Sequence, residues 1–269
     1  MTGTLSDDLM RDLAATAHAL ADAARPETLR HFRQAIATDD KTGAGAGFDP
    51  VTEADRASER AMREVLAARR PDDAILGEEY GATPGSSGLT WVLDPIDGTR
   101  AYISGMPTWG VLVSVCDATG PLFGLIDQPY IAERFEGGFG TARLMGPRGE
   151  MPLRGRAARP LAEATVMTTF PEVGTPAERA GFEAVSQAAR LTRYGMDCYA
   201  YALVAMGQVD LVVEAGLNSY DVCGPIAVIE AAGGIVTDWE GRPAHEGGRV
   251  LAAANAQIHA EALALLKGR

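Results

Sequence analysis

The sequence predicts a mixed α/β fold in which helices are layered on sheets. Three observations lead to this prediction. The N-terminal region has the apolar spacing of amphipathic helices. From Trp109 to Phe135, short apolar runs are separated by glycine and proline, which indicates β-strands. The rest of the chain alternates between strand-like and helix-like segments, a pattern that is typical of sheets covered by helices.

Helical patterns occupy the N-terminal region. Ser6 is a suitable N-cap for the first helix, which we expect to restart at Pro26 and to end near Ile36. Residues 41–47 are rich in glycine and alanine and predict an exposed, mobile loop. Thr52 begins the next helix in a capping-box pattern, with an aspartate in place of the usual glutamate three residues later.

The remaining elements are predicted from apolar runs bounded by turn residues. In the first half we expect strands at residues 74–76, 91–93, 111–115, 122–126 and 134–135, the last three in an antiparallel meander, and a turn-rich excursion at 81–88. In the second half we expect strands at residues 165–168, 209–213, 235–236 and 250–253, and helices at 177–189, 199–206, 222–232 and up to 266. The length of 269 residues fits a single domain, or two intimate subdomains of about residues 1–150 and 151–269.

The chain is strongly acidic. It has 24 Lys+Arg against 36 Asp+Glu, a formal net charge of −12 and a pI near 4.8. Binding to nucleic acid or to anionic lipid needs a basic face, so we expect neither a nucleic-acid partner nor a membrane partner. An acidic protein that binds phosphates usually needs metal ions, which supply the missing positive charge.

The cysteines and the N-terminus indicate a soluble, cytoplasmic protein. Cys116, Cys198 and Cys223 are too far apart in the sequence to suggest a disulfide framework or a zinc site. The first residues are acidic where a signal peptide would be basic. The longest uncharged run, residues 101–116, is interrupted by Pro107 and is too short to span a bilayer.

The densest chemical signal is the segment Asp94-Pro95-Ile96-Asp97-Gly98-Thr99. It follows an apolar strand, so both carboxylates should emerge where the strand ends. Pro95 restricts the turn, and Gly98 lets the backbone approach a ligand closely. Two carboxylates this close repel each other unless a cation lies between them, and hard oxygen ligands suit Mg²⁺. An aspartate-rich turn without a ligand is the alternative for this segment taken alone.

Other acids lie at comparable places. Glu78-Glu79 directly follows a predicted strand, and Asp221 opens a helix that runs to Gly233-Gly234. Asp49 precedes another helix start. An acid at a helix N-terminus is equally consistent with a simple cap, so Asp49 and Asp221 keep both interpretations.

Taken in order, these four motifs resemble the inositol monophosphatase family, from about residue 5 to the C-terminus. The resemblance implies a layered αβαβα sandwich, a Mg²⁺-dependent and lithium-sensitive phosphatase, and a homodimer. The chain departs from the common family pattern at Tyr220-Asp221, where the family usually has Trp-Asp, and at Arg100-Ala101-Tyr102, where it usually continues with Thr-Asn. Together with residues 194–201 and 214–217, these variants resemble the histidinol-phosphatase branch.

Carried over by position, the resemblance implies two or three Mg²⁺ ions in the active site, with Mn²⁺ as a substitute and Li⁺ as an inhibitor. Glu79 is either a support for this site, a ligand of the third metal or a solvated acid. The implied ligands of the first metal are Glu78, Asp94, Thr99 and the carbonyl of Ile96. The implied ligands of the second are Asp94, Asp97 and Asp221. Two such ions bring four positive charges, which four acids offset.

The implied catalytic residues are Asp49, Thr99 and Glu78. A water made acidic by the first metal would be the nucleophile, and Thr99 and Asp49 would orient it and accept its proton. The backbone N–H groups of Gly98 and Thr99, where a helix should begin, would hold phosphate oxygens. This scheme contains no covalent phosphoenzyme.

The implied substrate-binding residues are Asp97, Arg100, Asp197, Glu214 and Asp221. Glu214 matches the family position that contacts the organic part of the substrate. Asp197 stands where, by the same resemblance, inositol enzymes carry a small apolar residue, so an added carboxylate there suits a cationic substrate. A helix N-cap is the alternative for Asp197. Arg100 either contacts phosphate or pairs with a nearby acid.

The leading hypothesis is a Mg²⁺-dependent phosphomonoesterase that acts on L-histidinol phosphate, in histidine biosynthesis. This substrate carries an ammonium group and an imidazole, which inositol phosphate lacks. The alternatives are an inositol-1-monophosphatase or another phosphatase of small phosphomonoesters, and, from a different class, a metal-binding regulatory protein without catalysis. The presence of the acids at 49, 78, 94, 97 and 221 and of Thr99 disfavours the inactive protein.

Overall fold

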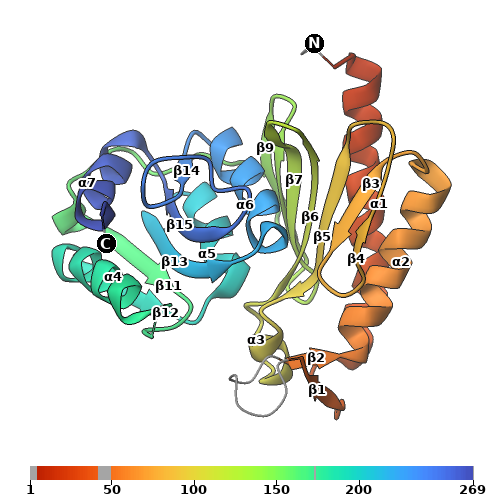
Figure 1. The fold of residues 1–269 in the computed structure, drawn as a ribbon, viewed down its shortest axis with the longest axis horizontal. Helices are drawn as coiled ribbons and strands as arrows, with labels where there is room; N and C mark the ends of the chain where they lie inside the picture. Colours follow the sequence, from red (N-terminus) through yellow and green to blue (C-terminus); the bar gives the residue numbers. More distant parts are fainter. Residues whose placement is uncertain (1–4, 42–49, 173, 269) are drawn as a thin grey trace.

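The computed structural model describes residues 5–41, 50–172 and 174–268. Within them, layers of helices alternate with two large sheets across the molecule (Figure 1). One helix pair covers each outer face, and a third pair lies between the sheets. These pairs are α1 (Asp7–His31) with α2 (Glu53–Arg69), α4 (Pro176–Ala188) with α7 (Ala256–Leu266), and, between the sheets, α5 (Asp197–Ala205) with α6 (Ser219–Ala231). The predicted layered α/β sandwich is confirmed.

The first sheet has eight strands in the order β10-β9-β8-β7-β6-β5-β3-β4. All neighbours are antiparallel except β3 and β5, which are parallel. The predicted meander is confirmed as β6–β8, and the short strands β4, β9 and β10 were not predicted. The strands are β3 (Ala74–Gly77), β4 (Gly81–Thr83), β5 (Thr90–Asp97), β6 (Gly110–Asp117), β7 (Gly120–Gln128), β8 (Glu133–Gly138), β9 (Thr141–Gly146) and β10 (Gly149–Pro152).

The second sheet has five strands in the order β12-β11-β13-β15-β14. Strand β11 runs parallel to both neighbours, whereas β15 is antiparallel to both of its own. A 3₁₀ turn, η1 (Leu161–Glu163), precedes β11. The strands are β11 (Thr165–Thr168), β12 (Leu191–Tyr194), β13 (Leu211–Leu217), β14 (Ile235–Thr237) and β15 (Gly248–Ala253). All except β12 were predicted.

Helix α1 continues through Pro26, so the predicted restart at this residue is wrong. A proline inside a helix removes one backbone hydrogen bond, but the buried stripe of α1 runs past it, and packing against α2 and the sheet keeps the helix continuous. Ser6 caps the helix as predicted, because its side chain accepts from the N–H of Leu9. The helix ends at His31 and not near Ile36.

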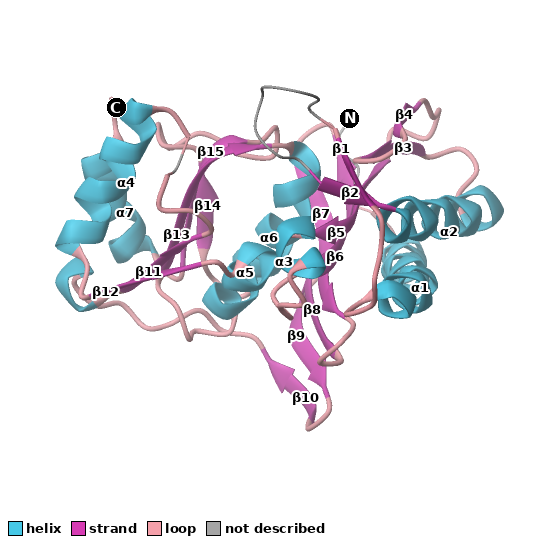
Figure 2. Ribbon diagram, turned by 90° about the horizontal axis from the view of Figure 1, so that it is seen from below, coloured by secondary structure: helices cyan, strands magenta, loops and turns pink. Residues whose placement is uncertain are grey.

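A small antiparallel ribbon precedes α2. It consists of β1 (Thr38–Asp40) and β2 (Pro50–Thr52), which lie beside the start of α2 (Figure 2). The predicted loop at 41–47 lies outside the described residues except for Lys41. The predicted capping box at Thr52 is confirmed, with Asp55 as its acidic member.

Apolar side chains fill the spaces between the layers. One cluster joins α1 and α2 to the first sheet, a second surrounds α5 and α6, and a third joins α4 and α7 to the second sheet. Because α6 is packed between two sheets, nearly every residue from Val222 to Ile229 is buried. Within the described ranges, no helix combines the length and the apolar character that crossing a bilayer requires.

Candidate active site

The acidic segment lies at the end of β5, where this strand leaves regular pairing with β6. The pairing register shifts between Asp94 and Asp97. Asp94 Oδ1 accepts a hydrogen bond from the N–H of Ile96 at 3.0 Å. Gly98 follows in a left-handed conformation with φ of 82°, and α3 (Thr99–Ile103) then begins. Strand β5 therefore includes both aspartates, whereas the sequence placed them beyond it.

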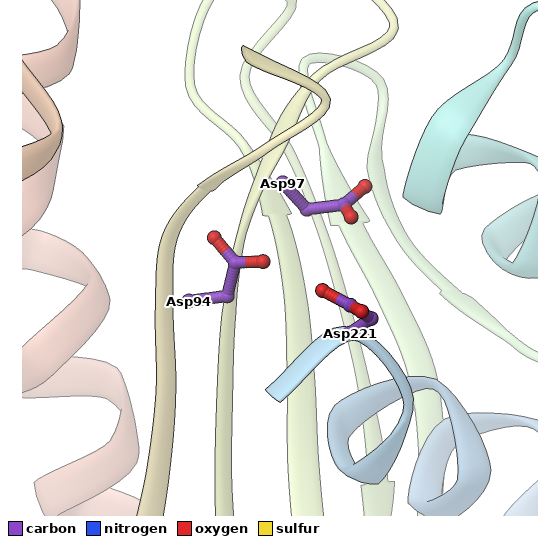
Figure 3. A group of neighbouring side chains, drawn as sticks. All are labelled: Asp94, Asp97 and Asp221. Carbon is purple, nitrogen blue, oxygen red and sulfur yellow. The ribbon is translucent and has the colours of Figure 1, made fainter. Parts of the chain in front are cut away.

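Three carboxylates from β5 and α6 converge (Figure 3). Asp94, Asp97 and Asp221 each offer one oxygen atom, and these atoms lie within 4.8 Å of one another. Asp221 is held in the first turn of α6, where its Oδ2 accepts from the N–H of Asn218 at 2.6 Å. Asp97 Oδ2 accepts from the N–H of Cys198 at 2.6 Å, at the start of α5. The structure thus brings together the whole ligand set predicted for the second metal.

Among the described residues, the charges that shift the pKa values of Asp94 and Asp97 are those of other acids. Burial, followed by repulsion from Glu78, Asp97 and Asp221, raises the pKa of Asp94 well above its usual value. Burial and repulsion from Asp221 do the same to the pKa of Asp97. Burial raises the pKa of Asp221 to about 7, although hydrogen bonds at Asn218 oppose this. A divalent cation would remove the repulsion, and carboxylate oxygens are ligands that Mg²⁺ accepts, so the residues fit a metal site.

The other ligands that the sequence predicted lie beside this cluster. Glu78 follows β3 and is close enough to Asp94 to raise its pKa. Thr99 Oγ1 lies 3.1 Å from the carbonyl oxygen of Ile96. Lys41 contacts Glu78 at 3.0 Å and Glu79 at 2.6 Å, so both glutamates already attract a cation. Glu78, Asp94, Ile96 and Thr99 all line one pocket.

Asp55 is a buried acid that the sequence analysis treated only as part of a helix cap. Its Oδ2 accepts from the N–H of Thr52 at 2.8 Å and from the Thr52 hydroxyl at 2.5 Å. Its Oδ1 lies 3.3 Å from Thr99 Oγ1. Burial raises the pKa of Asp55 to about 6. Asp55 is therefore the described acid in contact with Thr99. Asp49, which was predicted to act with Thr99 on the attacking water, lies outside the described residues.

Glu59 is a second buried acid on the same face of α2. Its carboxylate accepts from the N–H of Glu79 at 2.7 Å and from Arg63 at 2.8 Å. A Cβ atom at Gly77 would lie 2.0 Å from Glu59 Oε1, so only glycine fits there. Glu59 thus fixes the turn that carries Glu78. The sequence did contain a signal that these two acids are buried, because Asp55 and Glu59 lie on the same helical stripe as the buried Met62.

The acidic cluster opens into a pocket of about 410 Å³ that both sheet regions line. Among the described residues that line this pocket there are seven carboxylates and one guanidinium. With all of these groups ionised, the excess is six negative charges, and two divalent cations would cancel four of them. The seven are those of Glu78, Asp94, Asp97, Glu172, Asp197, Glu214 and Asp221, and the guanidinium is that of Arg100. The pocket therefore stays acidic even with both metal sites filled.

Asp197 lies against Gly98, one of the two residues predicted to hold phosphate oxygens. A Cβ atom at Gly98 would lie 2.8 Å from the Asp197 side chain, so the two residues pack directly together. Asp197 Oδ2 accepts from the Thr108 hydroxyl at 3.0 Å, and no described residue donates to its Oδ1. Burial raises the pKa of Asp197 to about 6. Asp197 is the first residue of α5, at φ of 46°, and the N-cap position is that of Met196, so the N-cap interpretation is wrong.

Glu214 lines the same pocket, but its carboxylate is largely occupied. Oε1 accepts from the N–H of Thr169 at 2.9 Å and from its hydroxyl at 2.6 Å, and Oε2 accepts from the Tyr201 hydroxyl at 2.7 Å. A carboxylate has about four acceptor positions, so about one is left for a substrate. Glu214 therefore holds the chain after β11 in place.

Arg100 belongs to α3 and reaches across the pocket. Its guanidinium lies 5.1 Å from the centre of the Phe170 ring. Its charge also lowers the pKa of Asp197, against the larger effect of burial. Both alternatives for Arg100, a phosphate contact and attraction to an acid, are compatible with this position.

Comparison with known proteins shows the family. The sequence profile of the inositol monophosphatase family matches residues 9–268. The chain is 37% identical to the bifunctional phosphatase IMPL2, chloroplastic, of Arabidopsis thaliana, over 98% of this chain and 77% of that protein. It is 32% identical to the histidinol-phosphatase of Streptomyces coelicolor, over 97% of this chain and 99% of that protein. It superimposes on an inositol monophosphatase from Zymomonas mobilis with a TM-score of 0.84 and 35% identity, covering 98% of this chain and 100% of that one.

The fold and the acidic pocket are those of a metal-dependent phosphatase of small phosphate esters. The chain belongs to the inositol monophosphatase family, as its motifs predicted. Its relatives carry the names of both histidinol and inositol phosphatases, so membership of the family leaves the substrate open.

Proposed function

We propose that this protein is a phosphomonoesterase that hydrolyses L-histidinol phosphate with water, giving L-histidinol and inorganic phosphate in histidine biosynthesis. The observation that carries this proposal is the half-buried carboxylate of Asp197 packed against Gly98. This carboxylate places a negative charge beside the predicted phosphate site. A cationic substrate would form a charge-assisted hydrogen bond with it, and a neutral substrate would not. The similarity to proteins named histidinol-phosphatase supports the same substrate.

The metal sites would be formed by residues already described. Asp94, Asp97 and Asp221 would hold one ion, and Asp94, Glu78, Thr99 and the Ile96 carbonyl the other. When bound, divalent cations stabilise the charge on phosphate oxygens and make a bound water more acidic. The family supports Mg²⁺ as the resident ion, with Mn²⁺ as a substitute and Li⁺ as an inhibitor.

The protein's own groups would position the reactants. Thr99, which contacts Asp55, would orient the attacking water and pass its proton to Asp55. The N–H groups of Gly98 and Thr99 would hold phosphate oxygens. The role expected of Asp49, the homodimer and the cytoplasmic location stay predictions.

The spacing of charges in the substrate matches the spacing in the pocket. In L-histidinol phosphate the ammonium group is on the carbon next to the CH₂ that carries the phosphate. A cation so near the phosphate needs an acid beside the phosphate site, and Asp197 touches Gly98. Its Oδ1 accepts from none of the described residues, which leaves an acceptor for the ammonium group.

Inositol 1-phosphate is the second candidate, because an inositol monophosphatase is among the similar structures. A neutral polyol would cover the half-buried carboxylate of Asp197 without supplying a cation, which is costly. We therefore expect this substrate to be the poorer one. A regulatory protein without catalysis is the third candidate, and it predicts metal binding but no hydrolysis.

Phosphate release from L-histidinol phosphate and from inositol 1-phosphate, measured side by side with Mg²⁺, tests the proposal. An EDTA control measures metal-independent release. We expect a clear preference for L-histidinol phosphate that EDTA abolishes. A preference for inositol 1-phosphate would contradict the proposed substrate, and release from neither would favour another phosphomonoester or the inactive protein.

A further inference from the structure

Phe170 is an exposed aromatic side chain on the wall of the acidic pocket. Its exposed fraction is 44%, whereas Tyr201 in the same pocket is 3% exposed. Leaving a phenyl ring in water forfeits the free energy that its burial would give. An exposed aromatic ring inside a binding pocket is therefore available for a planar or apolar part of a ligand.

The position of Phe170 is fixed by its neighbours. Thr169, the preceding residue, is bound to Glu214 through both its N–H and its hydroxyl. Pro171, the following residue, has a restricted backbone. Arg100 covers the ring from the α3 side, 5.1 Å from its centre. The ring is thus held in place before a ligand arrives, which lowers the entropy lost on binding.

The substrate proposed above would extend its ring toward this wall. Its ammonium group is one bond nearer to the phosphate than its imidazole ring is, and the Asp197 side chain packs against Gly98, in the proposed phosphate site. With phosphate and ammonium so placed, the imidazole would lie further into the same pocket, whose lining includes Phe170 and Glu172. A phenyl ring offers stacking to a neutral imidazole and a cation–π contact to a protonated one.

We propose that Phe170 is a specificity residue whose ring stacks on the imidazole of the substrate. This inference rests on the proposed function, because it assumes a substrate with a ring. The inference goes beyond the proposed function because it assigns recognition of the imidazole ring to Phe170, which is not one of the acids of the pocket. Glu214 would then act as a positioning residue, because it binds Thr169 and thereby positions the neighbouring Phe170.

The test compares wild type with Phe170→Leu, which keeps apolar bulk but removes the aromatic face, and with Phe170→Tyr, which restores it. The substrates are L-histidinol phosphate and phosphoethanolamine, which has the ammonium and phosphate groups but no ring. Tyr194→Leu is the matched control, because Tyr194 is 46% exposed and does not line the pocket. Melting temperatures show whether each variant folds.

We expect Phe170→Leu to raise KM for L-histidinol phosphate by about threefold to tenfold, with kcat within about twofold of wild type. Phe170→Tyr should return KM to the wild-type value, and kcat/KM for phosphoethanolamine should stay within about twofold throughout. An unchanged KM in Phe170→Leu would overturn the inference. An equal loss on both substrates would also overturn it, because it would place Phe170 with Arg100 at the phosphate.

Failure of the proposed function gives a different result. In that case wild type would hydrolyse phosphoethanolamine as well as L-histidinol phosphate, or would hydrolyse neither. If wild type prefers L-histidinol phosphate and Phe170→Leu keeps the full preference, the proposed function stands and the role of Phe170 is wrong.

Discussion

The two sheet regions contribute different things to the pocket. The eight-stranded region brings Glu78, Asp94, Asp97 and Thr99, all within or next to the ends of β3 and β5. The five-stranded region brings Phe170 and Glu214, and the two helices between the sheets add Asp197 from α5 and Asp221 from α6. The difference teaches that metal binding is built from compact motifs, whereas substrate recognition is assembled from distant segments.

Buried acids outside the pocket sharpen this comparison. Asp127 in the first sheet is fully buried but pairs with Arg134 at 2.7 Å and Arg25 at 2.8 Å. Asp210 in the second region pairs with Arg156 at 2.9 Å. Asp94 is as deeply buried and Asp97 is half-buried, yet the charges that act on their pKa values are those of other acids. Buried acids that repel one another therefore mark the site, and buried acids that are paired stabilise the fold.

The largest expected effect is that of Asp94→Asn. Activity with Mg²⁺ should fall by about a thousandfold, because Asp94 belongs to both proposed metal sites. Without metal the variant should melt no lower than wild type, because one of three repelling charges is gone. The rise in melting temperature that Mg²⁺ gives to wild type should disappear.

Asp127→Asn is the matched control for this variant. It removes a buried acid that is paired, so it should lower the melting temperature but keep the rise with Mg²⁺ and the hydrolytic activity. Near-wild-type turnover in Asp94→Asn with Mg²⁺ would contradict the metal sites proposed here.

A smaller effect is expected for Asp55→Asn. We expect kcat to fall by about a hundredfold, because Asp55 would no longer accept the proton passed by Thr99. The rise in melting temperature with Mg²⁺ should remain, which separates proton transfer from metal binding within the first region. Loss of that rise would instead make Asp55 part of metal binding.

The smallest effect concerns an acid of the first region far from the pocket. Burial alone raises the pKa of Asp73, but hydrogen bonds from Arg70, Ser87 and Trp91 outweigh this and hold the pKa below its usual value. A lowered pKa in the folded state stabilises the protein above about pH 4, and this stabilisation is lost as the pH falls through the folded pKa. Asp73→Asn should therefore cost about 1 kcal/mol of unfolding free energy at pH 7.

Unfolding in urea at pH 7 and at about pH 3 measures this change. The difference between Asp73→Asn and wild type should shrink at the lower pH, while phosphatase activity at pH 7 stays at the wild-type level. A difference that grows in acid would contradict the assigned sign of the pKa shift.

Much of the metal cluster was predictable because its acids occupy strand ends and helix starts. Asp94, Asp97 and Asp221 converge as expected. Asp55 and Glu59 were missed because a capping pattern explained the first and no motif pointed to the second. Their place on the apolar stripe of α2 was the available signal. The strands β9, β10 and β12 were missed because they are partly or largely exposed and lack a continuous apolar pattern.

The residues proposed to recognise the substrate were less predictable than the metal ligands, for a physical reason. The side chain of Asp197 packs against Gly98, and the backbone of Asp197 has a φ of 46°. No local sequence pattern predicts this backbone conformation. The occupancy of Glu214 by Thr169 and Tyr201 depends on three elements meeting in space. Such contacts arise from tertiary packing, so residue type and spacing alone do not reveal them.

The selectivity of Asp197→Ala tests the central claim most directly. The quantity is the ratio of kcat/KM for L-histidinol phosphate to that for inositol 1-phosphate, with Mg²⁺, in the variant and in wild type. We predict that the ratio falls by about tenfold to a hundredfold, because a charge-assisted hydrogen bond to the ammonium group is lost while the metal sites remain. An unchanged ratio, or an equal loss on both substrates, would contradict the assignment of substrate recognition to Asp197.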